Sequence, residues 1–164
     1  MAQKLIFPDF IAKFPPVDMP VTLGEDTHHI FSKENDPLSD ASISQFIHPL
    51  ETYIPDEEMT EYVPCFGIAD TEKFIALVWW KAELMNYEYH LATFTLKGDL
   101  ISHRVIAGTR VKEETVYRSV ATINEEYEIA ILEGESLDGD KMFDPTSSKT
   151  RFMEILVNGE IVDG

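Results

Sequence analysis

One short stretch, residues 25–29, groups four side chains that are potential metal ligands: Glu25, Asp26, His28 and His29. Successive side chains on an extended segment point in opposite directions, so His28 and His29 are not placed to coordinate the same ion. Metal sites on helices use pairs such as histidines four residues apart instead. The pattern favours a polar loop over a metal centre.

A second acidic group, Asp138, Asp140 and Asp144, surrounds the Asp138-Gly139-Asp140 sequence and suggests calcium. A calcium loop of the EF-hand type needs an oxygen ligand at its fifth position and Glu at its twelfth. Counted from Asp138, those positions hold Met142 and Lys149, so the match fails. We expect a solvated loop over 134–148, and we keep Asp138 and Asp140 as candidate binding residues within it.

Two histidines, His90 and His103, lie on the two arms of an expected hairpin that turns at Lys97-Gly98-Asp99. If Leu96 stands opposite Leu100, the register puts His90 beside Ile106 and His103 beside Thr93. This predicts two independent strand histidines, not an acid–base or metal pair.

The single cysteine, Cys65, lies between Val63-Pro64 and Phe66-Gly67, a setting typical of a small buried hydrophobic residue. No phosphate-binding glycine loop, zinc-ligand spacing, nucleophile elbow or kinase signature occurs in the sequence. The sequence therefore predicts no catalytic residue, no metal ligand and no cofactor, and the protein is not expected to be an enzyme.

The strongest binding candidates are aromatic: Trp79, Trp80, Tyr87 and Tyr89. Trp79 and Trp80 are adjacent in the apolar run 74–80, so in a strand they point to opposite faces. A strand that is apolar on both faces is typical of a central strand covered on both sides. A Trp left uncovered would instead line a ligand cleft or an interface.

The elements that must position these residues are mostly strands. Turn sequences Lys97-Gly98-Asp99 and Asn158-Gly159-Glu160 favour tight antiparallel hairpins. The pattern predicts strands near 63–69, 73–82, 87–96, 99–107, 115–123, 126–133, 150–157 and 160–162, with one short strand at 20–23. The expected fold is mainly β (α+β): an antiparallel meander of about seven or eight strands, forming a curved sheet or partly open barrel.

The first third of the chain is expected to cover this sheet. Residues 1–37 are rich in Pro and Phe, which predicts an irregular segment that packs its Phe side chains on the sheet. Apolar spacing predicts a helix over 39–48, capped by Ser39 or Asp40, and a second short helix over 56–62. We expect a single domain, 1–164, with an irregular and helical cover (1–62) and the meander (63–164).

The net charge is −17, from 13 Lys and Arg against 30 Asp and Glu. Such a chain should be repelled by nucleic acid and by anionic membranes, so neither is an expected partner. The charge fits plain solubility, or an acidic face for a basic protein. A single cysteine, no signal-peptide pattern and no long apolar run predict a soluble, cytoplasmic protein.

The order of features, from Tyr53-Ile54-Pro55 through 92–101 to Asn158-Gly159-Glu160, resembles a loose group of small uncharacterised bacterial β-meander proteins. Their shared phrase reads threonine, aromatic, three variable residues, glycine, one variable residue, leucine, isoleucine. The resemblance covers about 50–162. It implies a fold type and supplies no functional residues.

Two hypotheses for function stay open on the sequence. The first is a non-enzymatic interaction protein with an acidic surface, for example an immunity-type inhibitor of a basic protein. The second is a small-molecule binder, or an unrecognised enzyme, with an aromatic-lined cavity. The short acidic final strand disfavours edge-to-edge assembly there, and the oligomeric state stays open.

Overall fold

One continuous sheet dominates the computed structural model, which describes residues 7–53, 55–56, 58–137 and 148–164. Along the sheet the strands follow the order β1-β3-β4-β5-β6-β7-β8-β9-β10, and β2 pairs with β7. The strand bounds are β1 (Pro16–Val17), β2 (Val21–Leu23), β3 (Glu61–Ile68), β4 (Ile75–Glu83), β5 (Asn86–Phe94), β6 (Leu100–Lys112), β7 (Thr115–Ile123), β8 (Glu128–Leu137), β9 (Lys149–Ile155) and β10 (Ile161–Asp163).

The pairing is that of a meander: from β3 to β10 each strand lies antiparallel to the next one along the chain. The short β1 is the exception, because it runs parallel to β3. β1 and β10 lie at the two ends of the order and do not pair, so the sheet is not closed into a barrel. The mainly β, antiparallel fold predicted from the sequence is confirmed.

Glycine makes two of the predicted hairpin turns possible. Gly98 joins β5 to β6 with φ of +100°, and Gly159 joins β9 to β10 with φ of +93°. An L side chain rarely adopts these angles, whereas glycine does so without steric cost. The two predicted turns therefore form, one between β5 and β6 and the other between the last two strands.

β6 is the strand at which the sheet turns. Its first part pairs with β5 alone, and only residues 108–112 pair with β7. The part of β7 that does not pair with β6 pairs with β2 instead, with Val21 opposite Ile123 and Leu23 opposite Ala121. At Gly108 a Cβ would lie 2.1 Å from the carbonyl oxygen of Tyr87, so only glycine fits this close approach of β6 to β5.

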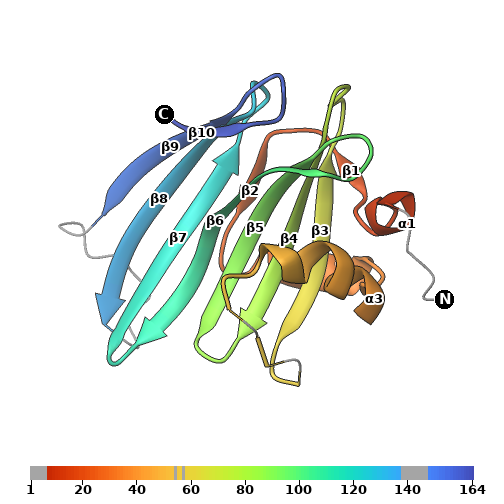
Figure 1. Ribbon diagram of the computed structural model, residues 1–164. Coiled ribbons are helices and arrows are strands. Elements are labelled where there is room, and N and C mark those ends of the chain that lie inside the picture. Colours follow the sequence, from red (N-terminus) through yellow and green to blue (C-terminus); the bar gives the residue numbers. More distant parts are fainter. Residues whose placement is uncertain (1–6, 54, 57, 138–147) are drawn as a thin grey trace.

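The turn at β6 brings the two halves of the sheet together (Figure 1). One core cluster includes Val78, Trp80 and Leu91 from β4 and β5, together with Ile131 and Ile155 from β8 and β9.

Hydrogen bonds connect the far end of the sheet to its middle. Thr93 Oγ1 donates to the carbonyl of Gly159 (2.6 Å), and a guanidinium nitrogen of Arg104 donates to the carbonyl of Ile161 (2.9 Å). The β9–β10 hairpin is thereby held against β5 and β6.

The helices are short: α1 (Phe7–Ile11), α2 (His28–Glu34), α3 (Asp40–Ser42), a π-helical turn η1 (Ile43–Ile47) and a 3-10 turn η2 (His48–Leu50). Ser39 caps α3 as predicted, because its hydroxyl accepts a hydrogen bond from the backbone N–H of Ser42 (3.1 Å). None of the described helices is long and apolar enough to cross a membrane.

The prediction of a helix over 56–62 is wrong. Residues 58–59 form a turn, and β3 already begins at Glu61, which pairs with Ala82 of β4. The last two residues of the predicted helix, Glu61 and Tyr62, belong to β3 instead. Pairing with β4 satisfies their backbone hydrogen-bonding groups.

The residues before β3 cover both faces of the sheet. α1 and η1 pack Phe7, Phe10 and Ile47 into a second cluster with Trp79 and Phe94. On the other face, α2 is attached to β3 by Asn35, whose side-chain amide donates to the carbonyls of Pro64 (2.7 Å) and Cys65 (2.8 Å). β4 is therefore covered on both sides, as its apolar sequence predicts.

Candidate functional site

β4 separates the two tryptophans onto opposite faces of the sheet. Trp79 lies in the cluster beneath α1 and η1 and is 1% exposed. Trp80 lies in the other cluster and is 8% exposed.

Of the two tryptophans, Trp80 lines a cavity within the described part of the chain. The cavity has a volume of about 300 Å³ and lies between the strands and the 24–29 segment; we call it the aromatic cavity. Three of the four aromatic residues singled out in the sequence line it, Trp80, Tyr87 and Tyr89, whereas Trp79 does not. Its lining is Gly24, Glu25, Asp26, His28, His29, Trp80, Tyr87, Tyr89, Gly108, Thr109 and Ser119.

Parallel rings form the wall of the aromatic cavity. The ring of His28 stacks on Trp80 with centroids 4.0 Å apart and planes 5° from parallel. Tyr87 is also parallel to Trp80, at 5.9 Å, and is 38% exposed. Of these rings Tyr87 keeps the most exposed aromatic surface, and that surface can stack on a ligand.

Hydrogen bonds hold the 24–29 segment over the strands. The Tyr89 hydroxyl donates to the carbonyl of Gly24 (2.9 Å), and the backbone N–H of Gly24 donates to Thr27 Oγ1 (2.9 Å). Arg118 donates to the carboxylate of Glu25 (3.2 Å). The segment that the sequence suggested as a polar loop thus closes one side of the cavity.

The groups around the cavity differ in charge and in hydrogen-bonding capacity. Burial, and then the neighbouring His29, lower the pKa of His28, so its ring is neutral at pH 7. Burial raises the pKa of Tyr89, which keeps its hydroxyl a hydrogen-bond donor. The carboxylates of Glu25 and Asp26 supply negative charge at the rim.

A second hollow, of about 450 Å³, adjoins the aromatic cavity; we call it the polar groove. The two share Tyr87, Gly108, Thr109 and Ser119. The groove is lined by both signs of charge: Glu88, Arg110, Arg118, Glu133, Glu135 and Lys149.

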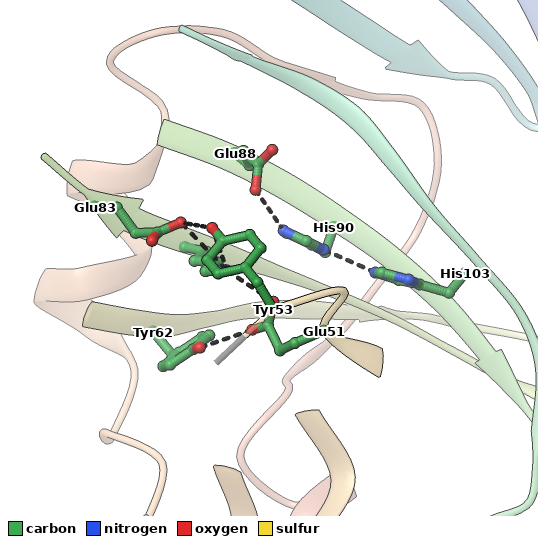
Figure 2. Close-up of polar contacts among 8 residues, drawn as sticks. Glu51, Tyr53, Tyr62, Glu83, Glu88, His90 and His103 are labelled. Carbon is green, nitrogen blue, oxygen red and sulfur yellow. Dashed lines mark hydrogen bonds and ion pairs between the residues drawn. The ribbon is translucent and has the colours of Figure 1, made fainter. Parts of the chain in front are cut away.

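On the Trp79 side of β4, a polar network surrounds the buried Lys81. Figure 2 shows its members Glu51, Tyr53 and Glu83. Lys81 is 1% exposed, and its Nζ donates to Glu51 (2.7 Å) and to the hydroxyl of Tyr53 (3.2 Å). Its Nζ also lies 3.3 Å from Glu83, and Tyr53 donates to the same Glu83 oxygen. Although burial opposes charge on Lys81, the hydrogen bonds to Glu51 and Tyr53 outweigh it and raise its pKa.

A hydrogen-bonded chain runs from Glu88 through His90 to His103 (Figure 2). His90 Nε2 lies 3.2 Å from Glu88, and His90 Nδ1 lies 2.7 Å from His103 Nε2. The hydrogen bond from His90 lowers the pKa of Glu88, so its carboxylate only accepts and His90 Nε2 carries a proton. The tautomers of the two rings decide which of His90 Nδ1 and His103 Nε2 donates in the second hydrogen bond.

The rings of His90 and His103 both stack on Trp79, at 5.4 and 5.8 Å. Trp79 Nε1 is buried and has no hydrogen-bond partner among the described residues. Burial, and then His90, lower the pKa of His103 to about 4. This stack is a tightly packed core element and not an open site.

The prediction that His90 and His103 are independent is wrong, and the reason is register. The β5–β6 ladder shifts between Thr93 and Phe94, so His90 stands opposite Val105 and His103 opposite Ala92. A shift of one residue moves side chains to the other face, and here it puts both histidines on the same face as diagonal neighbours. The irregularity has no signature in the sequence beyond the long, polar β6.

The remaining candidates from the sequence lie apart from the cavity. Cys65 is 1% exposed, and burial raises the pKa of its thiol. Among the described residues, no group of three or more His, Cys, Asp or Glu is placed to hold a metal ion. Asp138 and Asp140 lie outside the described residues.

Fold and site together define a mainly β protein with a folded antiparallel sheet and an aromatic cavity beside a mixed-charge groove. No family model, curated protein or solved structure matches the chain. The resemblance to small bacterial β-meander proteins thus stays a prediction, and function must be argued from the site.

Proposed function

We propose that this protein binds a small organic molecule in the aromatic cavity. The observation that carries the proposal is the His28–Trp80–Tyr87 wall facing a space of about 300 Å³ that no side chain fills. Small-molecule sites are typically concave, aromatic-lined spaces of about 300–1,000 Å³ with a few polar groups.

The polar groups of the cavity are few and differ in kind, as such sites require. Thr109 and Ser119 line the cavity from β6 and β7, and Asp26 lines it from the 24–29 segment. An aromatic wall with polar groups on two sides favours a ligand that has a flat face and a polar end.

The partial exposure of Tyr87 is consistent with a binding role. Tyr89, two residues away on the same strand, is 2% exposed, yet Tyr87 keeps 38% of its surface at the junction of cavity and groove. A large aromatic residue left half open at the mouth of a cavity offers a stacking surface at low entropic cost.

Tryptophan fluorescence tests the proposal, because the chain has two tryptophans and only Trp80 lines the cavity. In the variant Trp79→Phe, a ligand from a metabolite panel should change the emission of the remaining Trp80. The matched variant Trp80→Phe keeps Trp79 and should show no ligand-dependent change. A flat response of Trp79→Phe to the whole panel would count against the proposal.

We propose as a second candidate that the acidic surface binds a basic protein, on the strength of the net charge of −17. Charge complementarity of this kind speeds association and is weakened by salt. Retention of a basic protein from lysate at low salt, with release at high salt, supports it. The absence of any retained partner at low salt would contradict it.

A further inference from the structure

The aromatic cavity presents negative charge and π faces together. Glu25 and Asp26 contribute carboxylates, and none of its described lining residues is Lys or Arg. We infer that the ligand of this cavity is a small organic cation, an amine or quaternary ammonium that carries a flat or apolar group. The inference rests on the proposed function and names its ligand class.

The two carboxylates differ in what they already bind. Glu25 is paired with Arg118, whose Nε lies 3.2 Å from its carboxylate. Asp26 is exposed, and no Lys or Arg pairs with it among the described residues. Asp26 is thus the carboxylate left to meet a cationic group at the rim.

The ring wall favours a cation over a neutral or anionic group. A cation within about 6 Å of a Trp or Tyr ring centre is attracted by the quadrupole of the ring. Tyr87 presents such a face at the mouth of the cavity, next to Trp80. An anion would meet the same faces and the carboxylate of Asp26, and the described lining offers it no Lys or Arg.

The charge of the whole chain acts in the same direction. Thirty acidic side chains against thirteen basic ones produce a field that concentrates cations near the surface. The adjoining polar groove carries both signs, with Arg110 over the ring of Tyr117, and with Glu133 and Glu135 in the same lining. The cationic group is therefore expected in the cavity itself, at Asp26, and not in the groove.

Three probes of one shape and different charge test the inference: phenethylamine, phenethyl alcohol and hydrocinnamate, titrated into the full chain at neutral pH and low salt. We follow the indole N–H signal of Trp80 by NMR. Phenethylamine should bind about tenfold more tightly than phenethyl alcohol, and hydrocinnamate more weakly than either.

Two variants with the same loss of charge separate a local contact from the overall field. Asp26→Asn should reduce the preference for phenethylamine to about twofold or less. Asp163→Asn removes an exposed carboxylate at the end of β10, which is not part of the cavity lining, and should keep the preference.

Each outcome bears on the inference. Equal binding of phenethylamine and phenethyl alcohol, or tighter binding of hydrocinnamate, would overturn the cationic ligand class and leave the proposed function standing. Equal effects of the two variants would overturn the role of Asp26. If none of the three probes shifts the Trp80 signal, the inference is contradicted, and the metabolite panel with Trp79→Phe decides the proposed function separately.

Discussion

His103→Gln should flatten the dependence of stability on pH. The folded state holds the pKa of His103 at about 4, against 6.5 for an exposed histidine. Between pH 6.5 and about pH 4, His103 is therefore protonated in the unfolded chain but neutral in the folded chain. The free energy of unfolding falls as the pH is lowered through this range. Glutamine has a side-chain amide that can donate to His90 Nδ1 or accept from it, but it does not titrate.

The magnitude follows from the depressed pKa and the surroundings of the ring. Each unit of pKa difference corresponds to about 1.4 kcal/mol, which sets an upper limit of about 3 kcal/mol over the whole window. His103 is only partly buried, so solvent screening reduces the expected contribution to about 1–2 kcal/mol. The wild type should lose that much more free energy of unfolding than His103→Gln between pH 6.5 and pH 4.

Urea unfolding followed by circular dichroism at several pH values measures this difference. His103→Leu is the matched control at the same position, because it also removes the titration but leaves His90 Nδ1 without its hydrogen-bond partner. It should be equally flat with pH and less stable than His103→Gln by about 1–2 kcal/mol at pH 7. If His103→Gln keeps the full pH dependence of the wild type, the assignment of His103 as a partly buried histidine that stays neutral is refuted.

Three further substitutions test the buried contacts by urea unfolding. Lys81→Met should lower the free energy of unfolding by about 3–5 kcal/mol, because it leaves the buried Glu51 without its ion-pair partner. The double variant with Glu51→Leu should be less destabilised than Lys81→Met alone. Equal destabilisation of the single and double variants would contradict a coupled pair. Thr93→Val should lower the free energy of unfolding by about 1–3 kcal/mol, since it removes the hydroxyl that donates to the carbonyl of Gly159. A change within experimental error would show that this hydrogen bond does not hold the final hairpin. Gly108→Ala should destabilise the fold strongly, because its Cβ would lie 2.1 Å from a backbone oxygen, and wild-type stability would refute the close approach of β5 and β6.

The strands could be predicted from the sequence because their signals are local. Alternating Ile129 and Ile131, both buried in β8, and the glycine turns at Gly98 and Gly159 act within a few residues of where they occur. The apolar run of β4 likewise predicted its cover on both faces. Such patterns record which side of a strand meets the core.

The site was only partly accessible to the same reasoning. The aromatic residues could be named, but which tryptophan borders open space depends on how the sheet turns at β6 and on where the 24–29 segment lies. Those contacts join residues far apart in the chain, as with Tyr89 and Gly24. The His90–His103 pair was missed because an irregular register, which no local pattern encodes, decides which face a strand residue occupies.

The central claim is that a small molecule binds against Trp80, and the two indole N–H signals of the uniformly labelled chain test it most directly. Titration with a bound ligand should shift the Trp80 signal in a saturable way and leave the Trp79 signal in place, because Trp79 lies on the opposite face beneath α1 and η1. Movement of Trp79 alone, or equal movement of both signals, would contradict the aromatic cavity as the binding site.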